Sequence, residues 1–88
     1  VRLPDSPGGE VSLRGERYED AFAKLDKYLD QAYAAGLRSA RIIHGKGTGT
    51  LRDMVRKELN KRKYVTRYDY ALPHEGGEGV TVAYFSEN

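Results

Sequence analysis

Two stretches with helical hydrophobic spacing, set between shorter strand-like stretches, constrain the fold of this chain more than any other feature. From Tyr18 to Ala35, apolar side chains recur every three or four residues, the period of a helix with one buried face. A second stretch, from about Thr50 to Lys63, has the same spacing at Leu51, Val55 and Leu59. Alternating or β-branched residues characterise the remaining segments, which are Glu10–Arg14, Ser39–His44, Val65–Leu72 and Val80–Phe85.

The resulting order, β-α-β-α-β-β, predicts an α/β fold, a two-layer sandwich in which a four-stranded mixed sheet carries two helices on one face. Residues at the expected element ends agree with this order. Gly36 is a natural stop for the first helix, and Thr50 with Asp53 predicts a capping box for the second. Pro73 ends the third strand, and a glycine-containing loop at residues 74–79 leads into the last one.

Length and composition limit the classes of protein that are compatible with this order. The chain has 88 residues, enough for one domain, and its 39% hydrophobic and 32% charged residues are typical of soluble globules. Cysteine is absent, which excludes disulfides and thiolate metal sites. No apolar run approaches the roughly 20 residues that span a bilayer, so we expect a cytoplasmic protein without membrane contact. We interpret residues 1–9, punctuated by proline and glycine, as a linker from a larger parent protein, and residues 10–88 as one domain.

Basic residues are concentrated in the middle of the chain. The formal net charge is only +2, but the segment from Arg38 to Arg67 contains ten lysines and arginines against two acidic residues, Asp53 and Glu58. So unbalanced a segment creates a local positive field that attracts phosphate groups. The alternative is a solvated helix face, and charge alone does not decide between the two.

A glycine-rich turn, residues 45–49, joins the strand that ends at His44 to the second predicted helix. Unpaired amides at a helix start, together with the positive end of the helix dipole, form an anion site. Lys46 adds a full charge, Arg14 at the end of the first strand can grip a phosphate, and His44 can exchange protons near neutral pH. The pattern predicts a phosphodiester site with His44, Lys46 and Arg14 as catalytic residues. The predicted nucleic-acid-binding residues are Arg14, Gly45, Lys46, Gly47, Thr48, Gly49, Arg52 and Arg56.

Two other interpretations of this turn stand beside the phosphodiester site. A nucleotide-binding P-loop requires a lysine directly after the last glycine, whereas Lys46 lies between glycines, which argues against that motif. The other interpretation is structural, with glycines for a tight strand-to-helix connection and His44 hydrogen-bonded within the sheet. We favour the functional interpretation because the histidine, the lysine and the helix start occur together.

Three motifs in this chain resemble those of the small MutS-related (Smr) domain. The run from His44 to Gly49 matches the family's H-G-K-G-T-G motif. Upstream, Val11–Gly15 resembles its L-D-L-R-G or L-D-L-H-G strand end, and downstream, Gly76–Val82 resembles its G-G-x-G-x-T segment. Arg14 in the first motif makes the chain similar to the form at the C-terminus of a bacterial MutS paralogue that is associated with suppression of recombination.

The resemblance implies a fold similar to the C-terminal domain of a bacterial translation initiation factor. It also implies a DNA-nicking endonuclease that acts on branched or duplex DNA, or a non-catalytic module through which the parent MutS-like ATPase docks onto DNA, RNA or the ribosome. Members of the wider family have been connected with RNA and with stalled or collided ribosomes. Nucleic acid is therefore the expected partner, with DNA ahead of RNA.

One departure from the family pattern bears on catalysis. Ser12 stands where the family has Asp, and a carboxylate there can orient His44, hold a metal ion or act as a base. No metal-binding residue is predicted, since no ligand cluster is evident, and the need for a divalent metal stays open. Three tyrosines in or directly before the third predicted strand can stack on bases, although a core role is the more common use of such residues: Tyr64, Tyr68 and Tyr70.

Overall fold

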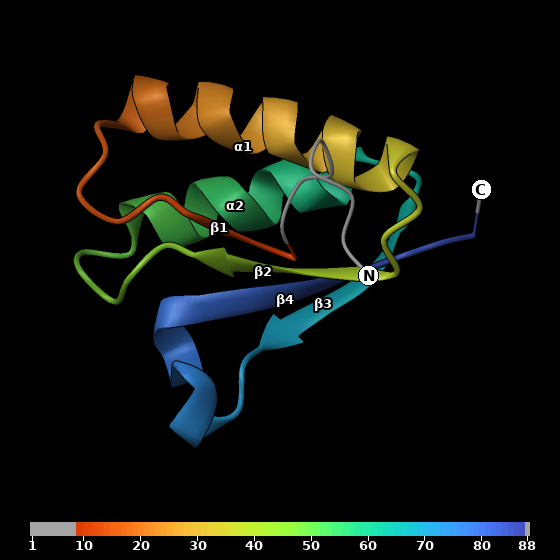
Figure 1. Cartoon of the computed structure of the whole chain (residues 1–88). Helices are drawn as coiled ribbons and strands as arrows, with labels where there is room; N and C mark the ends of the chain where they lie inside the picture. Colours follow the sequence, from red (N-terminus) through yellow and green to blue (C-terminus); the bar gives the residue numbers. More distant parts are fainter. Residues whose placement is uncertain (1–8, 88) are drawn as a thin grey trace.

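The computed structural model describes residues 9–87 and confirms the two-layer α/β fold (Figure 1). The predicted linker at residues 1–9 lies, except for Gly9, outside the described residues. The main elements follow the predicted order: β1 (Glu10–Ser12), α1 (Tyr18–Ala34), β2 (Ser39–Ile43), α2 (Thr50–Lys61), β3 (Val65–Tyr70) and β4 (Val80–Phe85). Between β3 and β4, the predicted loop forms two short 3-10 turns, Pro73–Glu75 and Gly77–Gly79.

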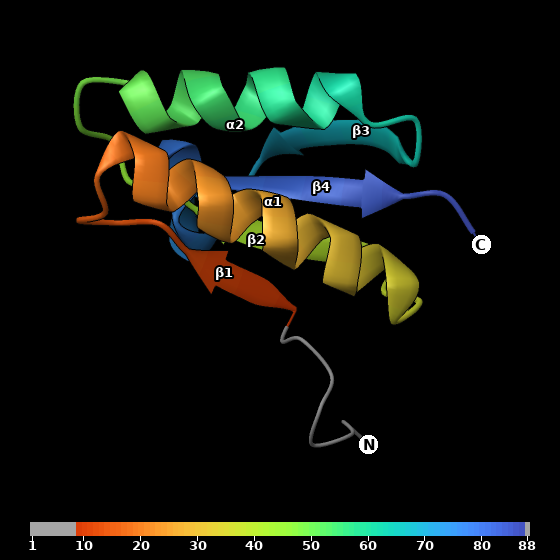
Figure 2. The same ribbon diagram turned by 90° about the horizontal axis from the view of Figure 1, so that it is seen from above.

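The four strands form one mixed sheet in the order β1-β2-β4-β3. β1 runs parallel to β2, whereas β4 is antiparallel to both β2 and β3. Both helices lie on the same face of this sheet, with α1 over β2 and α2 alongside β3 (Figure 2). Because side chains alternate along a strand, each strand presents one set to the helices and the other set to the uncovered face.

The core lies between the sheet and the two helices. Leu25 and Leu29 of α1, Val55 of α2 and Ile42 of β2 are completely buried, as the predicted helical and strand periods require. Burying each such side chain contributes about 1.5–3 kcal/mol, and these contacts hold the helices on the sheet. Within residues 9–87 no helix is long and apolar enough to cross a membrane.

The start of α2 differs from the predicted capping box. Gly49 occupies the capping position with a φ of 89° and has no side chain to cap the helix, while the hydroxyl of Thr48 accepts a hydrogen bond from the Thr50 amide at 3.4 Å. Thr50 is already helical, so its side chain cannot serve as the cap, and the Thr50–Asp53 capping box is wrong. A backbone with this φ favours glycine, and, as at any helix start, the first amides of α2 have no partner within the helix itself.

Several predicted elements end earlier in the structure. α2 stops at Lys61 rather than Lys63, because Arg62 is extended and its guanidinium turns back to Glu58. β1 ends at Ser12, two residues before the predicted end, and β2 ends at Ile43, one residue before its predicted end. His44 therefore belongs to the connection that follows β2.

Candidate nucleic-acid interface

His44 is buried directly after β2, with only 5% of its surface exposed. Its Nδ1 atom lies 2.8 Å from the carbonyl oxygen of Gly45, and its Nε2 atom lies 2.8 Å from the hydroxyl oxygen of Thr81 on β4. A carbonyl oxygen only accepts, so Nδ1 donates to Gly45, and in the neutral ring Nε2 accepts from the Thr81 hydroxyl. His44 therefore does have the structural role that was the alternative in the sequence analysis, because its side chain is hydrogen-bonded to the sheet through Thr81.

The surroundings of His44 favour its neutral form. Burial is the main reason that the pKa of His44 lies below its ordinary value of 6.5. The positive charges of Arg52 and Arg56 lower this pKa further, whereas the hydrogen bond to Gly45 opposes the shift. A neutral imidazole with both nitrogens occupied exchanges a proton with a ligand only after one of these hydrogen bonds opens.

We expect the stability of the domain to fall as the pH drops below about 6.5, because the unfolded chain then binds a proton at His44 that the folded chain binds less readily. The loss continues down through the lowered pKa of His44 and amounts to at most about 1.4 kcal/mol per pH unit. Urea unfolding of His44→Gln between pH 7.5 and pH 5 measures this contribution. The variant is expected to lose most of the slope, and the exposed His74 provides the control, since His74→Gln should retain it. An unchanged slope in His44→Gln would contradict the assignment.

Some backbone amides of the glycine turn are hydrogen-bonded within the domain and others are not. The amides of His44 and Gly45 both donate to the carbonyl oxygen of Gly79, at 3.1 and 2.9 Å. In the part of the chain that the structure describes, the amides from Lys46 to Gly49 make no hydrogen bond. The predicted amide cradle therefore begins at Lys46, and the amide of Gly45 is not available to a ligand.

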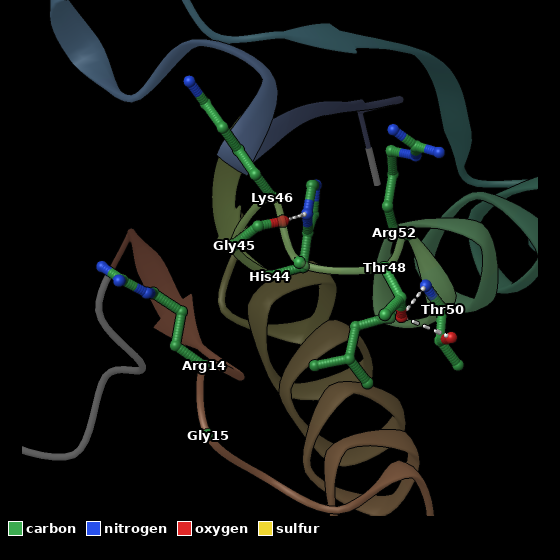
Figure 3. Close-up of a pocket in the computed structure, with 11 residues that line it drawn as sticks. Arg14, Gly15, His44, Gly45, Lys46, Thr48, Thr50 and Arg52 are labelled. Atoms are coloured by element: carbon green, nitrogen blue, oxygen red, sulfur yellow. Dashed lines mark hydrogen bonds between the residues drawn. The ribbon is translucent and has the colours of Figure 1, made fainter.

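An open pocket of about 310 Å³ lies over this turn and the start of α2 (Figure 3). Arg14, Lys46 and Arg52 contribute positive charge to its lining, and no carboxylate lines it. Arg14 and Lys46 form no ion pair within residues 9–87, whereas Arg52 lies 3.5 Å from the exposed carboxylate of Asp53. A second hollow of about 400 Å³ shares Arg14 and Lys46 with the first. The turn thus lies between two adjoining hollows, and the two cations that both hollows share have no ion-pair partner among the described residues.

Most of the predicted site residues come together around this pocket, and one does not. The pocket is lined by the predicted residues Arg14, His44, Gly45, Lys46, Gly47, Thr48, Gly49 and Arg52. Arg56 is not among its lining residues, because its guanidinium lies over the ring of Tyr70. Sequence reasoning missed the role of Thr81, which lies 37 residues from its partner His44. The only signal for Thr81 was its place in the downstream motif.

Ser12 lies apart from the buried histidine. It is exposed, pairs with Ile43 across β1 and β2, and lines neither hollow. His44 follows Ile43 and faces the helices, so Ser12 is on the opposite face of the sheet. A carboxylate at position 12 would consequently be directed away from His44. Among the described residues, no group of three or more His, Cys, Asp or Glu side chains is placed to hold a metal ion.

Comparison with known proteins supports the resemblance that the motifs indicated. The Smr domain family matches residues 11–86. Proteins called Endonuclease MutS2 from Ligilactobacillus salivarius and Halothermothrix orenii are 51% and 55% identical over 75 and 73 residues, which is 85% and 83% of this chain. The chain spans only about a tenth of the length of these relatives, at 10% and 9%.

Solved structures agree with the fold. The Smr domain of Thermus thermophilus MutS2 is 44% identical with a TM-score of 0.83, over 88% of this chain and 96% of that one. YdaL, a stand-alone small MutS-related protein from Escherichia coli, is 30% identical with a TM-score of 0.86, over 96% of this chain and 67% of that one. The fold, the three motifs and the family match together place this chain in the Smr domain family.

Proposed function

We propose that this domain binds the sugar-phosphate backbone of nucleic acid at the glycine turn, and that DNA is preferred over RNA. The observation that carries the proposal is the pocket, in which, as far as residues 9–87 show, Arg14 and Lys46 lack ion-pair partners, the neighbouring amides make no hydrogen bond and no carboxylate is present. A phosphate in this pocket gains charge-assisted hydrogen bonds from the side chains and weaker ones from the amides. The pocket offers charge and backbone donors, so it recognises the backbone rather than base sequence.

Nicking of DNA is the second part of the proposal, and the names of the endonuclease relatives and the position of His44 in the pocket lining favour it. In hydrolysis, water attacks phosphorus, a P–O bond breaks, and the leaving oxygen takes a proton. In this proposal, Arg14 and Lys46 neutralise the charge that develops on the phosphate. In the neutral ring Nε2 carries no proton, so His44 can accept a proton there, as a general base, once its hydrogen bond to Thr81 opens. The proposed setting is the cytoplasm, as part of a larger MutS-like ATPase in recombination suppression.

The salt dependence of binding tests the backbone contact. We expect a fluorescein-labelled DNA duplex to bind with an affinity whose logarithm falls against the logarithm of salt concentration with a slope of about −2 to −3, since two or three cations displace counterions. Fluorescence anisotropy from 25 to 300 mM salt measures the slope, and an RNA duplex of equal length measures the preference for DNA. An affinity that does not change with salt concentration would refute the proposal.

A plasmid assay distinguishes cleavage of DNA from binding of DNA without cleavage. Supercoiled plasmid is incubated with purified wild-type domain and with Lys46→Ala, in the presence and absence of Mg²⁺. If the domain cuts, the relaxed form accumulates with the wild type and much more slowly with Lys46→Ala. Equal relaxation by both proteins would assign the cutting to a contaminant, and salt-sensitive binding without relaxation would leave a docking module.

A further inference from the structure

Half-buried Arg56 and exposed Tyr70 form a cation–π pair on the seam between α2 and β3. The guanidinium carbon of Arg56 lies 4.6 Å from the ring centre of Tyr70 and 5.9 Å from that of Tyr68. Tyr70 remains 36% exposed although it is a large aromatic residue, and Leu72 beyond it is 56% exposed. Tyr64 and Tyr68, by contrast, pack against the core. Tyr70 is thus the one tyrosine of β3 that leaves a ring available at the surface.

The seam adjoins the phosphate pocket. Tyr70 pairs with Thr81 across β3 and β4, and the Thr81 hydroxyl holds His44. On α2, Arg56 lies one turn after Arg52, which lines the pocket. Figure 2 shows α2 running alongside β3, so the seam leads away from the glycine turn along the edge of the sheet.

Arg56 has no carboxylate partner for its charge among residues 9–87. Its Nε atom is buried without a hydrogen-bond partner among the described residues, and no carboxylate pairs with its guanidinium there. Its guanidinium rests on the ring of Tyr70, and an aromatic ring with an arginine beside it is the combination on which proteins stack the bases of single strands.

We propose that Arg56 and Tyr70 form a stacking subsite for an unpaired base of the strand whose phosphate occupies the glycine-turn pocket. The subsite rests on the proposed backbone site and narrows its substrate to DNA with a single-stranded or splayed segment. A paired base in a duplex presents only its edge to a side chain, whereas an unpaired base offers a free face. The charge of Arg56 suits the phosphates that flank the base.

The test compares two single-stranded oligonucleotides of equal length and charge, a fluorescein-labelled ten-residue oligo-dT and an abasic strand of ten residues. We expect the wild-type domain to bind oligo-dT more tightly than the abasic strand. Tyr70→Ala should weaken oligo-dT binding about five- to hundredfold, the usual range for one stacked base, and leave the abasic strand unchanged. Tyr70→Phe keeps the ring and should retain the wild-type affinity.

The opposite face of the sheet offers a matched control. There the guanidinium of Arg67 lies 4.1 Å from the ring centre of Tyr84, the same kind of pair, remote from the pocket. Tyr84→Ala should leave oligo-dT binding unchanged. If Tyr70→Ala binds both strands like the wild type, the stacking subsite is overturned while the backbone site stands. If neither strand binds in a salt-sensitive manner, the backbone site and the subsite fail together.

Discussion

Replacing both Arg14 and Lys46 by alanine is expected to lower the affinity for DNA about hundredfold at low salt, because each charge-assisted contact to phosphate contributes about 1.5–3 kcal/mol. Both side chains line the two adjoining hollows and form no ion pair within residues 9–87. Their charges are therefore available to a ligand, and removing them should also make the salt dependence shallower by about two counterions. Anisotropy titrations at several salt concentrations measure both effects.

Two exposed lysines provide the matched control for this double variant. Lys57 on α2 and Lys63 after it carry the same total charge, and neither lines the glycine-turn pocket. The variant with alanine at both positions should lose less than about threefold in affinity, through the weaker general field alone. If it loses as much as the Arg14 and Lys46 variant, binding depends on the overall positive field and the pocket has no special role.

The second prediction with a large effect is a loss of folding stability when Glu58, on the buried side of α2, is replaced. Glu58 is only 5% exposed, and its carboxylate accepts hydrogen bonds from Lys61 at 3.1 Å and Arg62 at 3.2 Å. Arg62 in turn pairs with Asp26 of α1, so the group ties the two helices together. Glu58→Ala is expected to cost about 3 kcal/mol, because the charge of the largely buried Arg62 loses one of its two partners.

Thermal unfolding at pH 7 measures this cost, which corresponds to a fall in Tm of about 12–24 °C for a domain of this size. The exposed pair of Glu16 and Lys24 supplies the control, and Glu16→Ala should change stability by less than about 1 kcal/mol. An equally small effect of Glu58→Ala would show that the buried pair does not stabilise the fold.

The contribution of Glu58 also depends on pH. Burial alone would raise the pKa of Glu58, but the hydrogen bonds and charges of Lys61 and Arg62 outweigh burial and place the pKa below 4.5. A lowered folded pKa stabilises the domain above about pH 4.5, and this stabilisation is lost as the pH falls through the lowered value. The difference in stability between the wild type and Glu58→Gln should shrink in that range.

Hydrophobic spacing along the chain was sufficient to predict the order of the elements and the layer architecture. The stripe at Val55 and Leu59 and the β-branched run at Ile42 describe local surfaces that must be buried, whatever they pack against. Boundaries were less predictable where a side chain makes a distant contact. Arg62 ends α2 early because its guanidinium bonds back to Glu58 and across to Asp26.

For the candidate site, the sequence by itself determined the glycine turn, the helix start and the cations Lys46 and Arg14, because chain neighbours and strand ends are readable from local pattern. Only the tertiary structure decided how these groups are used. Placing β4 between β2 and β3 brings Thr81 to His44 and Gly79 to the first amides of the turn, and it leaves Tyr70 under Arg56. Such contacts depend on the order of the strands in the sheet, because that order makes residues that are far apart in the chain into neighbours. Hydrophobic spacing is a local property of each segment, so it does not determine which strands pair.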